Sequence, residues 1–184
     1  LTDGGSLDVS VQPTLVGAVA SELPTFARLP WLTESALDVT TRIIATSAIV
    51  RASPDDAAGQ AGWESALRND VADLLNRQRP DGGWSWCPSG CRPDAWLTAW
   101  ALIGLGEAAR ADVKVDETAM SNGVSILVGA INRVSDVTSP ISPDDRAFFL
   151  HALAVAGFGE SQRPVINAQF EQYRAKLSPV GQAY

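Results

Sequence analysis

The chain has 184 residues, of which 46% are hydrophobic and 19% are charged, a balance that is ordinary for one globular domain with a sizeable core. Its formal net charge is -7, and the 14 Lys and Arg residues are scattered, which argues against a nucleic-acid partner. No segment has the ~18 uninterrupted apolar residues of a membrane span, and the first residues are too polar for a signal peptide. We therefore expect a domain that has been cut from a longer polypeptide.

Apolar periodicity divides the chain into a short extended segment followed by helices. Residues 7–12 alternate between apolar and polar side chains, which predicts a short strand or an extended linker, so residues 1–13 are assigned to this linker. Residues 14–178 are assigned to the domain itself and residues 179–184 to a tail. The sequence predicts an all-α domain whose helices cover, in chain order, about residues 15–23, 33–50, 63–76, 95–106, 116–134, 144–156 and 166–177.

Two kinds of helix alternate along the domain. Residues 63–76 place apolar side chains on one stripe and charged ones opposite, and residues 116–134 are again amphipathic. Ala95–Gly106 carry no charge, and residues 147–159 carry none if His151 is neutral. Because a helix that is apolar on all sides must be surrounded by other elements, the uncharged helices are expected to form the inner ring of an α/α toroid. The chain would supply a partial or shortened ring of about seven helices.

An internal repeat relates the two uncharged helices. When the sequence is aligned with itself at an offset, small and apolar residues of the two helices occupy matching positions. The matched pairs are Trp96 with Phe149, Leu97 with Leu150, Ala99 with Ala152, Ala101 with Ala154, Gly104 with Gly157, Gly106 with Gly159, and Glu107 with Glu160. Chance recurrence of Ala and Gly is the alternative explanation. The repeat favours the toroid, and its small residues would let inner helices pack closely.

A glycine-rich turn precedes the first uncharged helix. The turn reads Q-x-x-D-G-G-W and consists of Gln78, Asp81, Gly82, Gly83 and Trp84, and the helix after it begins with Trp96, Leu97 and Thr98. These segments, with LDVSVQPTLVGAV before them and DVKVDETAMSNGVSIL after them, resemble the thioester-containing domain of the α2-macroglobulin and complement family. The resemblance is to the bacterial branch of large extracellular α-helical proteins, and it covers most of residues 7–160. It implies an α/α toroid.

Reactive members of that family carry a Cys-x-Glu-Gln sequence, whose cysteine and glutamine side chains form a thioester. The corresponding region here consists of Trp31, Leu32, Thr33, Glu34 and Ser35, and it contains no cysteine. Without the sulfur no thioester forms, so the resemblance implies a non-enzymatic domain that contributes to non-covalent protease trapping or envelope defence. It further implies an extracellular or envelope location, and other domains of the parent polypeptide and proteases as partners.

The two cysteines, Cys87 and Cys91, lie in a C-P-S-G-C segment whose proline and glycine can turn the backbone. The spacing predicts a local disulfide, which would indicate an exported protein. A free thiol pair and half of a zinc site are the alternatives. A zinc site would need carboxylate ligands, because His151 is the only histidine and no second cysteine pair exists. We expect no metal and no cofactor.

The other polar groups near the uncharged helices have structural explanations. His151 stands, by the repeat, where Thr98 stands, and we expect a hydrogen-bonded core histidine rather than a catalytic one. Asp94, Asp144 and Asp145 lie at helix starts, where carboxylates cap exposed N–H groups.

The tryptophans near the turn leave a second function open. We expect them to build the core, although they could also stack a sugar or a terpene; they are Trp84, Trp86, Trp96 and Trp100. The alternative function is therefore a toroid enzyme that acts on a glycan or an isoprenoid. Such an enzyme needs two convergent carboxylates, whereas the acidic residues here are explained by capping. We assign no catalytic residue.

Overall fold

The computed structural model describes residues 35–52, 57–87, 91–132 and 141–184. Every regular element within these residues is a helix, which confirms the all-α class. The predicted extended segment over residues 7–12 and the predicted helix over residues 15–23 lie outside the described residues. The helices are α2 (Ala36–Ala52), α3 (Ala57–Asn76), α4 (Ala95–Arg110), α5 (Glu117–Asn132), α6 (Pro143–Val155), α7 (Arg163–Tyr173), the 3-10 helix η1 (Arg174–Lys176) and α8 (Pro179–Ala183).

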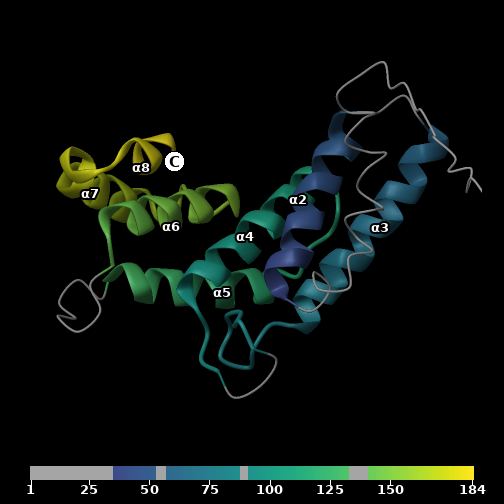
Figure 1. Cartoon of the computed structure of the whole chain (residues 1–184), viewed down its shortest axis with the longest axis horizontal. Coiled ribbons are helices and arrows are strands. Elements are labelled where there is room, and N and C mark those ends of the chain that lie inside the picture. The colour runs from purple at the N-terminus through teal and green to yellow at the C-terminus, as the bar shows by residue number, and fades with distance from the viewer. Residues whose placement is uncertain (1–34, 53–56, 88–90, 133–140) are drawn as a thin grey trace, which may run out of the picture.

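Helices α2, α4 and α6 form a row with α4 in the middle (Figure 1). A Cβ atom on Gly104 of α4 would lie 2.8 Å from Cγ2 of Thr40 in α2. A Cβ atom on Gly106 would lie 2.4 Å from the carbonyl oxygen of Val155 in α6. Both distances are shorter than van der Waals contact, so the two glycines allow α4 to approach both neighbours closely. The expected role of small residues is confirmed for α4 but not for Gly157 and Gly159, which lie beyond the end of α6, where a Cβ on Gly157 would meet no atom within 4 Å.

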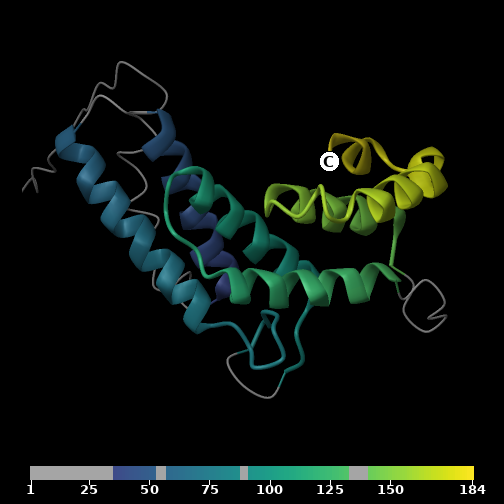
Figure 2. The same ribbon diagram turned by 180° about the vertical axis from the view of Figure 1, so that it is seen from behind.

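The remaining helices cover the row. Helix α3 packs on α2, α5 packs against α4 and α6, and α7 and α8 pack on α6; Figure 2 shows this arrangement from behind. Helix α4 is thereby surrounded along most of its length, and Leu97, Leu102 and Leu105 are fully buried, whereas Trp96 in its first turn is exposed. The expectation that other elements surround the uncharged helix is confirmed for the part of α4 after Trp96.

Helix α6 is covered less completely than its lack of charge predicts. Phe148, Phe149 and Leu153 are buried, but Ala154 is exposed and His151 is half-buried. Helix α7, which packs on α6, has no buried residue. One side of α6 therefore stays open along its second half.

Helix α3 has the one-sided pattern that the sequence predicts. Leu67 and Leu74 are fully buried, whereas Arg68 on the opposite side is exposed. The carboxylate of Asp70 pairs with the guanidinium of Arg42 in α2, with 2.8 Å between Oδ1 and Nη2. Helix α3 is thus attached to α2 by an apolar stripe and one partly buried ion pair.

Successive helices alternate between the row and its cover, as the units of an α/α toroid do. The described helices do not establish a closed ring, so the toroid stays a prediction. Residues 179–184, which the sequence assigns to a tail, include α8 on the surface of α6. A helix of 5 residues is too short to give a periodic signal, which explains why the sequence analysis missed it.

Gly106→Ala should destabilise the protein by about 1–3 kcal/mol, because the added Cβ would collide with the backbone of Val155. Gly129→Ala in α5 is the matched control, since a Cβ there meets no atom within 4 Å and alanine favours a helix by about 1 kcal/mol over glycine. Urea unfolding followed by circular dichroism measures both changes. Equal stabilisation by the two substitutions would contradict the close contact between α4 and α6.

Candidate functional site

The Q-x-x-D-G-G-W turn connects α3 with α4 and also reaches α5. The side-chain amide of Gln78 donates hydrogen bonds of 2.8 Å to the carbonyl oxygens of Gly82 and of Ala119 in α5. The φ angle of Gly82 is +100°, a region in which other residues are strained. Two backbone bonds close the turn, from the N–H of Arg79 to the carbonyl of Gly83 and from the N–H of Gly82 to the carbonyl of Arg79. Gln78 therefore holds the turn against α5.

The turn and the helix ends that it holds together form a joint, which Trp84 completes. Its side chain is fully buried, and the indole N–H donates to the carbonyl of Leu74 at the end of α3, at 2.8 Å. Its backbone N–H donates to Oγ1 of Thr98 in α4, and its carbonyl accepts from the backbone N–H of Asp94. A Cβ on Gly83 would lie 2.9 Å from the same Thr98 hydroxyl oxygen. The family-like residues of the turn thus meet as a structural joint, whereas Asp81 is exposed.

The prediction that carboxylates cap the helix starts is confirmed for Asp94 and wrong for Asp144 and Asp145. Oδ1 of Asp94 accepts the backbone N–H of Leu97, which caps α4. The N-cap of α6 is Ser142, which accepts the N–H of Asp145 and donates its hydroxyl to the Asp145 carboxylate. Asp144 instead accepts the backbone N–H of Ser178, the residue before α8, at 2.9 Å. All three acids near α4 and α6 therefore have hydrogen-bond partners within the fold.

The region that the sequence resemblance matches to the thioester is only partly described. Trp31, Leu32, Thr33 and Glu34 lie outside the described residues. Ser35 precedes α2, where its hydroxyl accepts the backbone N–H of Asp38 and donates to the Asp38 carboxylate. The residue near the position of the reactive glutamine thus serves as a helix cap.

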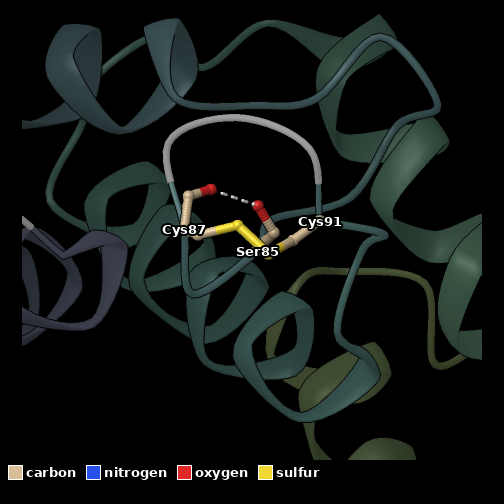
Figure 3. Close-up of a disulfide and its surroundings, with 3 residues drawn as sticks. All are labelled: Ser85, Cys87 and Cys91. Carbon is tan, nitrogen blue, oxygen red and sulfur yellow. Dashed lines mark hydrogen bonds between the residues drawn. A yellow bond between two sulfur atoms is a disulfide. The ribbon is translucent and has the colours of Figure 1, made fainter.

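Cys87 and Cys91 form a disulfide with a Cα–Cα distance of 6.0 Å (Figure 3). This confirms the predicted local bridge and excludes the free thiol pair and the zinc half-site. The hydroxyl of Ser85 donates to the carbonyl of Cys87 at 2.8 Å, as the dashed line in Figure 3 shows. Trp86 lies between these two residues, so its backbone is held from both sides.

Five aromatic rings contact one another in a row, which we call the aromatic strip; its middle ring, Phe148, is buried, and the rings at its ends are exposed. It consists of Trp86, Trp96, Trp100, Phe148 and Tyr184. The rings of Trp86 and Trp96 are stacked at 22° with 6.2 Å between centroids. Phe148 contacts Trp96 and Trp100, each at 5.5 Å, and Tyr184 at 5.2 Å. The strip therefore extends from the disulfide over α4 and α6 to the residue after α8.

Much of the strip is accessible. Trp86, Trp96 and Tyr184 are 52%, 38% and 49% exposed. The prediction that the four tryptophans build the core is confirmed for Trp84 and wrong for Trp86 and Trp96. The contacts that Phe148 makes in the strip were not predicted from the sequence, because its neighbouring rings belong to distant segments of the chain.

An open groove of about 580 Å³ lies next to the strip, between α6, α7 and α8. The imidazole of His151 lines it, 5.7 Å from the ring of Tyr184. The expectation of a core histidine is therefore wrong, since the ring is half-buried at an open surface. The remaining lining residues are mostly apolar: Ala147, Leu150, Ala154, Ile166, Asn167, Phe170, Arg174, Ala175, Leu177, Gly181 and Gln182.

Comparison of the chain with protein-family models, with curated proteins and with solved structures found no match. Across the described ranges, no three His, Cys, Asp or Glu side chains are placed to hold a metal ion together. None of the helices in that part of the chain is long and apolar enough to cross a bilayer. The aromatic strip and the groove are the two surface features of the described residues that could bind a partner.

Thr98→Val should destabilise the protein by about 1–3 kcal/mol, because the buried backbone N–H of Trp84 loses its acceptor. Thr40→Val is the matched control: Thr40 is equally buried, but its hydroxyl only donates to the carbonyl of Ala36 in its own helix. We expect the control to change stability by no more than about 0.5–1 kcal/mol. Chemical denaturation of both variants checks the difference, and equal losses would contradict the role of Thr98 in the joint.

Proposed function

We propose that this chain is a non-enzymatic binding domain of an α2-macroglobulin-like exported protein and that it contributes non-covalent contacts to protease trapping. The observation that carries the proposal is the exposed pair of stacked rings, Trp86 and Trp96, at one end of the aromatic strip. Large exposed aromatic patches are typical of interaction surfaces. Tryptophan and tyrosine are also the side chains that most often anchor protein partners.

The ordering of these two rings supports a binding role. Trp96 lies in the first turn of α4, which Asp94 caps, and Trp86 directly precedes the bridged Cys87. Side chains that are ordered before binding lose little conformational entropy when a partner arrives. The strip is therefore suited to hold a protein surface without any covalent bond.

Several features agree with a non-covalent role in an exported protein. Ser35, near the position of the reactive glutamine, caps a helix. The Cys87–Cys91 disulfide is of a kind that persists in oxidising compartments. Asp94, Asp144 and Asp145 each bond within the fold, which supports a structural role for these acids over the paired carboxylates of glycoside hydrolysis.

A glycan ligand is the second candidate, because exposed indole faces also stack on sugar rings. The same Trp86 and Trp96 pair favours a glycan ligand. Nothing in the groove favours it, because no acidic residue of the described chain lines the groove. The two candidates predict different results for one pair of substitutions.

The test uses the longer polypeptide that carries this domain, as wild type and as the Trp86→Ala/Trp96→Ala variant. Each is incubated with a broad-specificity protease, and the remaining activity is measured on a large protein and on a small peptide. We expect the wild type to shield the large substrate while the peptide is still cleaved. Loss of the two anchoring rings should weaken protease retention by on the order of tenfold or more.

Arg68→Ala is the control variant, since it removes an exposed ion pair with Glu64 on α3, outside the strip. It should retain protease like the wild type. If the double tryptophan variant shields as well as the control, the strip does not contact the protease. If it instead loses binding to a glycan array while shielding is unchanged, the glycan candidate replaces the present one.

A further inference from the structure

Helices α4 and α6 of the row are parallel. Near their starts, the rings of Trp96 and Phe148 lie 5.5 Å apart. Toward their ends, Gly106 approaches the backbone of Val155. The first turns of α4 and α6 are therefore in contact with each other, and so are their last turns, as expected for a parallel pair.

Helix α8 stands beside α6 in the same orientation. At its start, the N-cap residue Ser178 is bonded to Asp144 in the first turn of α6, and Gly181 lies against the same carboxylate. At its end, Tyr184 contacts Phe148 and His151, about one turn further along α6. Helix α8 is thus the next member of the row.

The starts of α6 and α8 also match in sequence. Ser142–Phe148 reads SPDDRAF and Ser178–Tyr184 reads SPVGQAY, so Ser, Pro and Ala coincide and an aromatic residue ends each stretch. In both, the serine hydroxyl accepts backbone N–H groups of the first turn and the proline occupies the first turn. After Phe148, α6 continues as an apolar helix to Val155. Because α8 begins in the same way as α6, we expect α8 to be continued by an apolar helix as well.

The open groove lies along that line. Ala154 of α6 lines it and is exposed, although its counterpart in the internal repeat, Ala101 of α4, is fully buried. On the other wall, Phe170 of α7 is 50% exposed and Ile166 is only partly buried. Ile166 and Phe170, one turn apart on α7, therefore have no complete cover here. Both walls of the groove therefore carry apolar side chains that nothing in the described part of the chain covers.

We propose that this groove is the binding site of one more α-helix of the same polypeptide, parallel to α6 and in line with α8. The α6–α8 interface continues directly into the groove, which makes a helix in this direction the best occupant. Small lining residues such as Ala147, Ala154 and Ala175 let a helix backbone approach closely. The mostly apolar lining requires an occupant whose facing side is uncharged and rich in Ala and Leu, as in α4 and α6.

The experiment places a surrogate helix in the groove. A copy of Phe149–Val155, the remainder of α6, is fused after Tyr184, which continues the match between the starts of α6 and α8. A second fusion carries the same residues in scrambled order. Ala154→Cys reports on the groove, because Cys87 and Cys91 are bonded to each other and leave the new thiol as the reactive one. Ala109→Cys, exposed on α4, is the control position.

We expect the copied helix to slow maleimide labelling at position 154 by about tenfold or more and to leave position 109 unchanged. The melting temperature should rise with the copied helix and not with the scrambled one. Equal protection by both fusions, or protection by neither, would overturn the proposal. Protection at position 154 in the unextended protein that grows with concentration, together with dimers in sedimentation, would assign the groove to a second copy and also overturn it. The outcome does not depend on whether the domain takes part in protease trapping.

Discussion

Trp84 is the residue that holds α3 and α4 in position relative to each other. Its indole N–H holds the end of α3, while its backbone N–H and carbonyl hold the start of α4 through Thr98 and Asp94. Gln78 attaches the same turn to α5. Because the ring is completely buried, each of these polar groups would be costly to leave without a partner. Trp84 and Gln78 together therefore fix where three helices meet.

The two open surfaces of the molecule meet at a single ring. Tyr184 contacts Phe148 in the aromatic strip and His151 in the groove. A helix bound in the groove would also restrict Tyr184, and hence one end of the strip. Partner binding at Trp86 and helix binding in the groove would then be physically connected through Phe148, which contacts rings on both sides.

Sequence reasoning succeeded where local chemistry decides the structure. The lack of charge around Leu102 predicted a surrounded helix, the position of Asp94 predicted a cap, and the spacing of Cys87 and Cys91 predicted a disulfide. It failed where the outcome depends on which neighbour is present. Indole rings bury well in general, but Trp96 lies on the side of α4 where cover is incomplete, and no local pattern reveals that.

The two glycines of α4 also determine the rotational phase of that helix. Gly104 faces α2 and Gly106 faces α6, so α4 cannot turn about its own axis without losing both close contacts. The angular position of Trp96 is thereby set by residues more than two turns away. Insertion or deletion of one residue between Trp96 and Gly104 would rotate the indole by about 100° around the helix and separate it from Trp86. The length of this segment is therefore constrained as well as its composition, and homologous domains that keep the tryptophan pair should show no insertion or deletion in it.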